Sequence, residues 1–258
     1  MRKFFTHTSP ALAAVLTLSM AFTGICHSQQ ARVVGQWDIL AGGMEAGTNG
    51  VTRWVAPQKT VLEFSTNWVV RAGALQNVGG TEVSGLKPEY ESSTNLTVRA
   101  GVLLVKPNAP NRVRTALFTG HHVARLANFP DGGEEGSWDA VGSAKGVRIF
   151  VNGEESAPLQ TGWQIVSFIA PSEMPLEKAM VFADPFTAWK RTFEGETKCV
   201  ILLSGAVSEA ALRGMEGALK VRCGVAGIRP ATQQERRAAQ AISGYNSHGV
   251  WRTLFLVK

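Results

Sequence analysis

The chain has little cysteine, few tyrosines and few charged residues for its length. Its 258 residues include 3 cysteines and 2 tyrosines, and 18% are Asp, Glu, Lys or Arg. The sequence has no CxxC pair, no GxSxG elbow, and no P-loop or dinucleotide-binding glycine pattern. It therefore lacks the usual signatures of zinc-ribbon proteins, α/β-hydrolases, P-loop NTPases and Rossmann dehydrogenases.

The basic residues outnumber the acidic ones but do not cluster. There are 26 Lys and Arg against 20 Asp and Glu, and two of the basic residues, Arg2 and Lys3, lie at the very start of the chain. The others are scattered, apart from the pair Arg236 and Arg237. A nucleic-acid interface needs a basic stripe or patch, so we expect no nucleic-acid partner.

Residues 1–28 have the pattern of a signal peptide, with a positive start followed by an apolar run over residues 11–25. Cleavage fits between residues 28 and 31. Cys26 leaves open an alternative in which the thiol carries lipid, although Ile25 stands where a lipoprotein signal has Gly or Ala. We therefore expect a protein that is secreted, periplasmic or at the cell surface.

The apolar run of the leader is shorter than the ~20 residues that cross a bilayer, and no later segment approaches that length. The mature chain is therefore expected not to span a membrane. Its size fits a main domain over residues 32–227, followed by a C-terminal helix-strand extension over residues 228–258.

Short apolar or alternating runs, separated by Gly, Pro, Asn and Asp, fill most of the mature chain. This pattern is typical of an all-β protein. It predicts strands over residues 33–40, 61–64, 68–71, 97–105, 114–119, 122–127, 147–151, 163–169, 179–182 and 198–204. It predicts loops over residues 41–50, 106–111 and 129–137. The expected fold is a two-sheet antiparallel jelly-roll β-sandwich with a helix after a late strand and a short C-terminal helix-strand tail.

The turn and cap residues are specific. Asn152-Gly153 is the preferred dipeptide for a two-residue hairpin turn, because both residues tolerate positive φ. Thr232 and Glu235 form a capping box that predicts a short helix as far as residue 242. The last run, over residues 250–258, is expected to be a strand that pairs into a sheet or, alternatively, a tail that docks on a protein partner.

A longer helix is predicted between the N-cap Ser208 and the stop Gly224. Its helical spacing gives one apolar face, with Ala211, Leu212, Met215, Ala218 and Leu219. The same spacing predicts that Glu209, Arg213, Glu216 and Lys220 face away from the core.

Two cysteines remain after the leader, Cys199 and Cys223. A strand from residue 199 to 204 and a helix of about fourteen residues have similar lengths, so the chain returns to the level at which it started. An exported protein also meets an oxidising environment. We therefore predict a Cys199–Cys223 disulfide, with two free thiols as the alternative. A metal site is less favoured, because neither cysteine has a CxxC partner or a nearby histidine.

The segments VRIFVNGE, GWQIVSFI and FEGETKCVILLSGAVSEAALRGMEGALKVRCG follow one another over about 80 residues. In this order they resemble the concanavalin A-like lectin/glucanase superfamily, in particular the laminin-G-like (LamG) domains of exported bacterial proteins. The resemblance implies a β-sandwich and a lectin-like binding role, with calcium and sugar sites on its loops. The sequence departs from the family at His121-His122, which Gly120 precedes in place of Trp, and at Lys198-Cys199, which replaces an acidic residue.

Carbohydrate or cell-surface glycan is the leading ligand class, and no catalytic residue is assigned. Exposed aromatic rings stack on the apolar faces of sugars, and the candidates are Trp138, Trp163 and Trp189. A loop with acidic oxygens and glycines is the candidate for calcium, which is the only cofactor considered. Its ligands would be Asp131, Glu134, Glu135 and Asp139.

Three alternatives remain open at this point. Each tryptophan could lie in the core, and the acidic loop could be merely solvated. The chain could serve as a structural or assembly module of a surface or envelope complex. It could also be a glycan-degrading enzyme, for which Glu194 and Glu196 have the spacing of a carboxylate pair.

Overall fold

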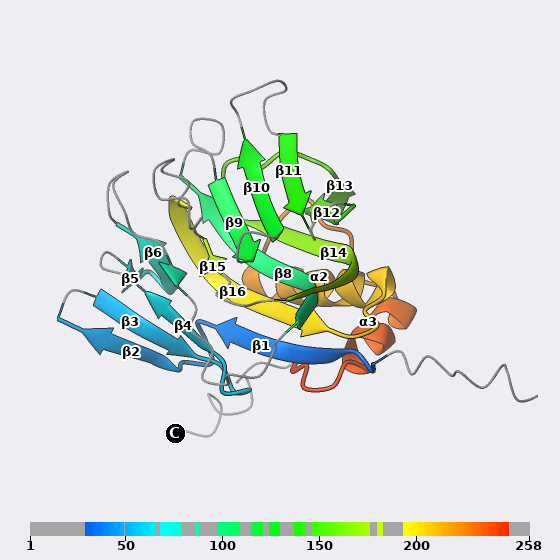
Figure 1. Cartoon of the computed structure of the whole chain (residues 1–258), viewed down its shortest axis with the longest axis horizontal. Helices are drawn as coiled ribbons and strands as arrows, with labels where there is room; N and C mark the ends of the chain where they lie inside the picture. Colours follow the sequence, from blue (N-terminus) through cyan, green and yellow to red (C-terminus); the bar gives the residue numbers. More distant parts are fainter. Residues whose placement is uncertain are drawn as a thin grey trace, which may run out of the picture.

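The computed structural model describes residues 29–48, 50–64, 68–78, 86–87, 97–108, 115–120, 124–129, 137–142, 146–175, 180–182 and 193–247. For residues 86–87, 115–120, 124–129, 137–142, 175 and 180 it describes the backbone. The described chain forms three antiparallel sheets and two helices (Figure 1). The predicted all-β sandwich is therefore confirmed.

One large sheet forms the centre of the molecule. Its eight strands are β1 (Arg32–Asp38), β5 (Trp68–Arg71), β6 (Ala74–Asn77), β8 (Thr97–Pro107), β12 (Arg148–Val151), β13 (Glu154–Glu155), β14 (Gln164–Pro175) and β16 (Gly195–Ser204). The order is β13-β12-β14-β8-β16-β6-β5, and β1 pairs with the part of β16 that β6 leaves free. The sheet is thus built around three long strands, β14, β8 and β16.

Two smaller sheets cover one face of the large sheet. The first contains β2 (Met44–Gly47), β3 (Gly50–Val55), β4 (Val61–Phe64) and β7 (Leu86–Lys87). The second contains β9 (Thr115–Gly120), β10 (Ala124–Phe129), β11 (Ser137–Gly142) and β15 (Met180–Val181). The apolar core between the layers includes Trp37 and Leu202 of the large sheet, Trp54 and Leu62 of the first small sheet, and Val181 of the second.

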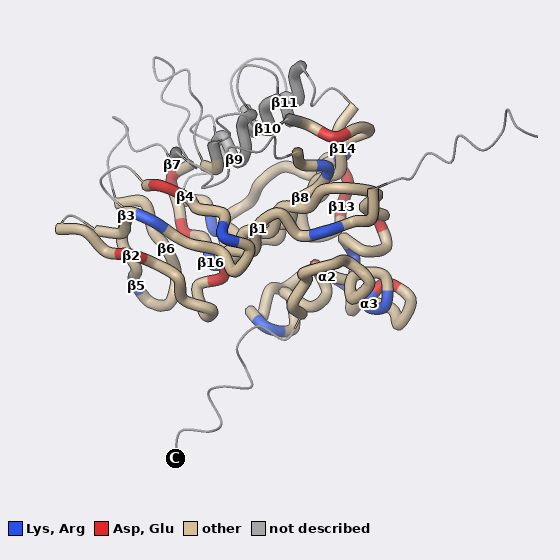
Figure 2. The backbone as a smooth tube through the Cα atoms, turned by 60° about the horizontal axis from the view of Figure 1, so that its bottom comes forward, with Lys and Arg blue, Asp and Glu red and all other residues tan. Residues whose placement is uncertain are grey.

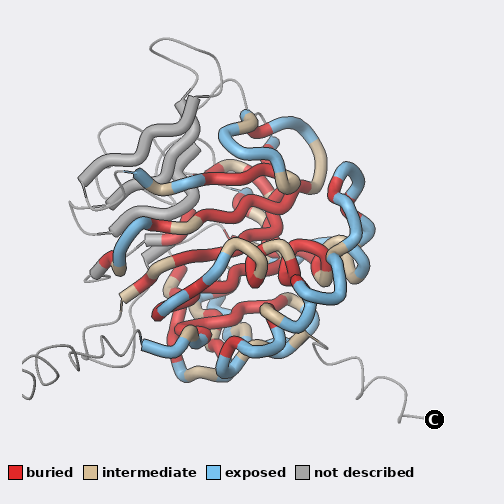
Figure 3. The backbone as a smooth tube through the Cα atoms, turned by 90° about the vertical axis from the view of Figure 1, so that its right-hand side faces the viewer, coloured by how far each residue is buried: buried red, intermediate tan, exposed pale blue. Residues whose placement is uncertain are grey.

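The opposite face of the large sheet is covered by α2 (Glu209–Cys223) and α3 (Gln233–Gln240). Successive side chains of a strand point to opposite faces. Along β16, Cys199, Ile201 and Leu203 accordingly face the helices, whereas Val200 and Leu202 face the small sheets. Strands covered on both sides are apolar on both sides, and Figure 3 shows them as a buried centre.

The predicted turn and caps are confirmed. Asn152 and Gly153 have φ of 52° and 87° in the turn between β12 and β13. Ser208 caps α2 by accepting a hydrogen bond from the Ala211 N–H, and Gly224 ends the helix in the left-handed region with φ of 66°. The capping box of Thr232 and Glu235 is also present at the start of α3.

Two local predictions are wrong. The segment 41–50 was expected to be a loop, yet it contains β2, whose short exposed residues pair with β3 by backbone hydrogen bonds that composition does not reveal. Glu216 was expected to face away from the core, yet its side chain is 1% exposed. A carboxylate tolerates burial when it has partners, and Glu216 accepts hydrogen bonds from Ser167 of β14 and Arg213 of α2.

Along the described backbone, Lys and Arg are interspersed with Asp and Glu, without a long stretch of one sign (Figure 2). Within the described residues, no helix is long and apolar enough to cross a membrane.

Candidate binding groove between the two helices

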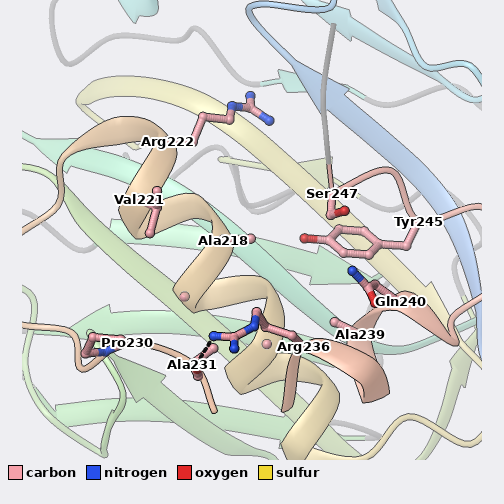
Figure 4. Close-up of a pocket in the computed structure, with 12 residues that line it drawn as sticks. Ala218, Val221, Arg222, Pro230, Ala231, Arg236, Ala239, Gln240, Tyr245 and Ser247 are labelled. Atoms are coloured by element: carbon pink, nitrogen blue, oxygen red, sulfur yellow. Dashed lines mark hydrogen bonds between the residues drawn. The ribbon is translucent and has the colours of Figure 1, made fainter. Parts of the chain in front are cut away.

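A groove of about 730 Å³ lies between α2 and the segment that carries α3 (Figure 4). This volume is within the range of ~300 to 1,000 Å³ that is typical of small-molecule sites. The groove is lined by Gly214, Gly217, Ala218, Val221 and Arg222 of α2, and by Pro230, Ala231, Arg236, Ala239, Gln240, Tyr245 and Ser247 of the following segment.

Small side chains on both walls create the groove. A methyl group on Gly214 would lie 2.1 Å from the carbonyl oxygen of Glu235, and one on Gly217 would lie 2.5 Å from the Cβ of Ala231. Real Cβ atoms do not approach other atoms so closely, so only glycine lets the two segments pack at this distance. The two helices therefore meet at the glycines and leave a hollow beside Ala218 and Val221.

The segment that carries α3 is held in place by charge and by capping. Glu235 is bound by the Arg229 guanidinium and by the backbone N–H of Thr232 at 2.8 Å. The Arg229 hydrogen bonds, followed by the capping contacts with Thr232, lower the pKa of Glu235 to about 2. The carboxylate is thus ionised and fully occupied at neutral pH.

Arg236 is the groove cation without a carboxylate partner. Its Nη1 donates to the backbone oxygen of Ala231. Within the described part of the chain, no carboxylate lies within ion-pair distance of Arg236, and its remaining donors are unused. None of the described residues that line the groove is Asp or Glu. The wall formed by α3 therefore presents uncompensated positive charge.

Arg222 lies at the end of the groove and is mostly buried. Its guanidinium pairs with Asp38 of β1, and the two side chains are 9% and 2% exposed. Asp38 also accepts a hydrogen bond from the Leu40 N–H at 3.0 Å. The Nε of Arg222 is buried without a hydrogen-bond partner, which is rare for a polar atom in a protein interior.

Tyr245 supplies the aromatic surface of the groove. Its ring packs against the core beneath the helices, and Figure 4 shows its hydroxyl directed toward α2. Burial is the main cause that raises the pKa of Tyr245 above its ordinary value. The phenol is therefore neutral, and it combines an apolar face with a group that donates and accepts hydrogen bonds.

The predicted Cys199–Cys223 disulfide is wrong for this structure, since both cysteines are free thiols. The strand and helix do return the chain to one region, because Cys223 packs against the cluster that contains Cys199. A disulfide also requires Cβ atoms about 3.8 Å apart with matching directions, which segment lengths do not specify. Burial raises the pKa of both thiols, so they are protonated at neutral pH.

A second polar cluster joins the other side of α2 to the β12–β13 hairpin. Arg148 pairs with Glu155 and Glu209, each at 2.7 Å, while Arg213 pairs with Glu216 at 3.0 Å. Both guanidiniums lie over the Phe150 ring, at 5.0 and 4.4 Å from its centroid. Every charge in this cluster has a partner, so the cluster holds the helix to the hairpin and leaves no group free for a ligand.

The three tryptophans predicted to stack on sugars are not among the described residues that line the groove. Trp163 is half-buried immediately before β14, and the Lys198 ammonium covers its ring at 4.4 Å from the centroid. Trp138 lies on β11, where its backbone pairs with Asn128. Trp189 lies outside the described residues. The role of the three tryptophans in sugar binding stays a prediction.

The predicted calcium ligands are only partly described. Asp139 lies on β11, opposite Ala127, while Asp131, Glu134 and Glu135 lie outside the described residues. Over the part of the chain with described side chains, no group of three His, Cys, Asp or Glu residues is arranged to hold a metal ion. The calcium site therefore stays a prediction.

The two carboxylates considered for catalysis, Glu194 and Glu196, have different surroundings. Glu196 forms an ion pair with Lys106 at 2.8 Å, with its side chain 18% exposed. Glu194 precedes β16, and its backbone oxygen accepts a hydrogen bond from the Asn108 N–H at 2.9 Å. Neither residue lines the groove.

Sequence reasoning missed the residues that form the groove. The available signal was the pair Gly214 and Gly217, which interrupts an otherwise regular amphipathic helix one turn apart. Glycine costs about 1 kcal/mol in a helix relative to alanine, so a pair of them on one face indicates close packing. Tyr245 is one of only two tyrosines in the chain and could have been considered beside the tryptophans.

Comparison with known proteins does not assign this chain to a family. No family model matches the chain, and no curated protein matches its sequence. Among solved structures, it is similar to domain 4 of AbnA, a GH43 extracellular arabinanase from Geobacillus stearothermophilus, solved in complex with arabinotriose. The TM-score is 0.35 at 15% identity, over 70% of this chain and 96% of that chain. A similarity of this size carries no argument about the ligand, which has to be argued from the groove itself.

Proposed function

We propose that this protein binds carbohydrate without cleaving it, and that the groove between α2 and α3 is a binding site. The observation that carries the proposal is the combination of the Tyr245 ring with hydrogen-bonding groups in one open groove. Sugar sites pair an aromatic face with a few placed polar groups. Gln240 and Ser247 are the polar side chains beside Tyr245, and Arg236 lies farther along the groove, toward Ala231 (Figure 4).

The absence of a carboxylate from the groove lining supports a non-catalytic role. Glycoside hydrolysis ordinarily requires two carboxyl groups on either side of the scissile bond, about 5 to 10 Å apart. The groove offers hydroxyl, amide and guanidinium groups instead. We therefore expect no release of reducing sugar by the full chain, and none that Glu194→Gln or Glu196→Gln would abolish.

The proposal includes export and a laminin-G-like affiliation. The pattern of residues 1–28 supports a leader, and the segments around the hairpin and α2 support the affiliation. Calcium bound near β10 is part of the same proposal, with Asp131, Glu134, Glu135 and Asp139 as ligands. Affinity measurements with and without calcium test this component separately from the groove.

A panel of oligosaccharides measured by isothermal titration calorimetry tests the main proposal. Tyr245→Leu is expected to weaken binding at least about tenfold, because it removes the stacking face. Since Tyr245 also packs against the core, Gln240→Ala serves as a second variant that removes only a polar contact. Arg237→Gln, on α3 but not in the groove lining, is the matched control and should leave the affinity unchanged.

Two results would contradict the proposal. If Trp163→Ala weakens binding and Tyr245→Leu does not, the sugar site lies elsewhere on the sandwich. If no oligosaccharide binds with or without calcium, the assembly role becomes the better account. In that case, deletion of residues 248–258 should remove association with a partner without unfolding the domain.

A further inference from the structure

We infer that the groove selects acidic sugars, and that Arg236 is the residue that pairs with the sugar carboxylate. This inference rests on the proposed function, because it names the class of carbohydrate bound at the same site. The ligand class is an oligosaccharide that contains uronic acid. Three observations on charge and hydrogen bonding carry it.

The first observation is the charge of the walls. Among the residues that the structure describes, the groove is lined by two arginines and by no acidic residue. Asp38 neutralises Arg222, and the nearby Glu235 is neutralised by Arg229. Arg236 is therefore left with a full positive charge facing the groove.

The second observation is the state of the Arg236 guanidinium. A guanidinium has five N–H donors in a planar fork that matches a carboxylate with two parallel hydrogen bonds. In Arg213 and Arg229 this fork is occupied by the carboxylates of Glu216 and Glu235. Arg236 uses its Nη1 for a backbone oxygen, and the described residues offer it no carboxylate. A ligand carboxylate is the group that accepts two parallel hydrogen bonds from this guanidinium.

The third observation is the aromatic ring on the same segment as Arg236. Tyr245 lines the groove together with Arg236, and its phenol donates and accepts hydrogen bonds. Arg222, the other arginine of the lining, is paired with Asp38 and its side chain is 9% exposed, so it adds no free cation. The groove thus combines one available guanidinium with an aromatic face for a sugar ring.

The test compares trigalacturonic acid with its neutral counterpart, galactotriose, by isothermal titration calorimetry on the full chain. The acidic sugar is expected to bind at least about tenfold tighter, since a hydrogen-bonded pair of charged groups is stronger than a pair of neutral groups. Arg236→Gln should bring the ratio of the two affinities close to one. Arg237→Gln, which changes the next residue of α3 and does not line the groove, should leave the ratio unchanged.

The outcomes separate this inference from the proposed function. If both sugars bind equally and Tyr245→Leu weakens both, the groove binds carbohydrate and the selection of acidic sugars is wrong. If trigalacturonic acid binds and Arg236→Gln has no effect on the ratio, the assignment of Arg236 is wrong. If neither sugar binds, both proposals fail. A sulfated trisaccharide as a further probe shows whether the site prefers a planar carboxylate or accepts any anion, and equal binding of the two would overturn the carboxylate assignment.

Discussion

Arg213 and Arg236 lie on neighbouring helices of the same layer, and their surroundings differ. The Arg213 side chain is 17% exposed, and its guanidinium contacts Glu216 and Glu209 and lies over the Phe150 ring. The Arg236 guanidinium has a single backbone acceptor and faces a groove without acidic residues. The comparison teaches that the same residue type acts as scaffold where its charge is compensated, and is available for recognition where it is not.

The two regions also differ in how closely their elements pack. On the side of Arg213, long side chains fill the space between α2, β14 and the hairpin. On the side of Arg236, Gly214 and Gly217 meet α3 and its preceding segment, and small residues leave a hollow. Substitutions on both sides test whether the two regions also differ in their contribution to the free energy of unfolding.

The largest effect is expected from Glu216→Ala. The variant removes a buried carboxylate, leaves a cavity, and deprives Ser167 and Arg213 of their acceptor. Breaking a buried pair in this way destabilises a protein by about 3 to 5 kcal/mol. Urea denaturation measures the free energy of unfolding, and Glu216→Gln, which keeps the volume, serves if the alanine variant does not fold.

Glu209→Ala is the matched control for that substitution. Glu209 is 41% exposed and pairs with the same arginine, and exposed pairs contribute no more than about 1 kcal/mol. Equal losses for the two variants would show that the cluster beside the hairpin is not a buried scaffold.

A smaller effect is expected from Gly214→Ala. Alanine favours helix by about 1 kcal/mol, yet its methyl group would overlap the Glu235 carbonyl, so we expect a net loss of about 1 to 3 kcal/mol. The displaced α3 should also weaken sugar binding. Val221→Ala, at a position 82% exposed, should change the unfolding free energy by less than about 0.5 kcal/mol. A Gly214→Ala variant that is more stable than the parent would contradict the close packing.

The last effect appears only at alkaline pH and concerns the buried thiol of Cys199. Burial first, and then the charge of Asp38, raise the pKa of Cys199 well above 9.0, so the folded state holds this proton more tightly than the unfolded state. Stability is therefore full below pH 9.0 and falls above it, by about 1.4 kcal/mol per pH unit for one such group. Denaturation curves measured across this range should show a shallower fall for Cys199→Ala. An unchanged slope would mean that the thiol titrates as it does in water.

Local signals predicted the parts of the fold that local chemistry controls. Asn152-Gly153, Ser208, Gly224 and Thr232 each act through their own backbone conformation or a nearby N–H, and each is where it was expected. The apolar run over residues 198–204 predicted a strand, and β16 contains it.

The remaining features depend on partners that are distant in the sequence. Burial of Glu216 requires Ser167, which lies 49 residues earlier, and burial of Asp38 requires Arg222, which lies 184 residues later. The groove depends on the approach of α3 to two glycines of α2, and not on any motif of its own. Helical periodicity and composition do not register such pairings, and this is why the candidate site had to be found in the structure.

The most direct test of this account is to measure both stability and affinity for Arg213→Gln and Arg236→Gln. We predict that Arg213→Gln loses about 3 kcal/mol of unfolding free energy, because Glu216 keeps a buried charge, and binds trigalacturonic acid with an unchanged Kd. We predict that Arg236→Gln changes stability by less than about 0.5 kcal/mol and raises the Kd at least about tenfold. If both variants lose stability to the same extent and neither changes the Kd, the division between scaffold and recognition side is contradicted.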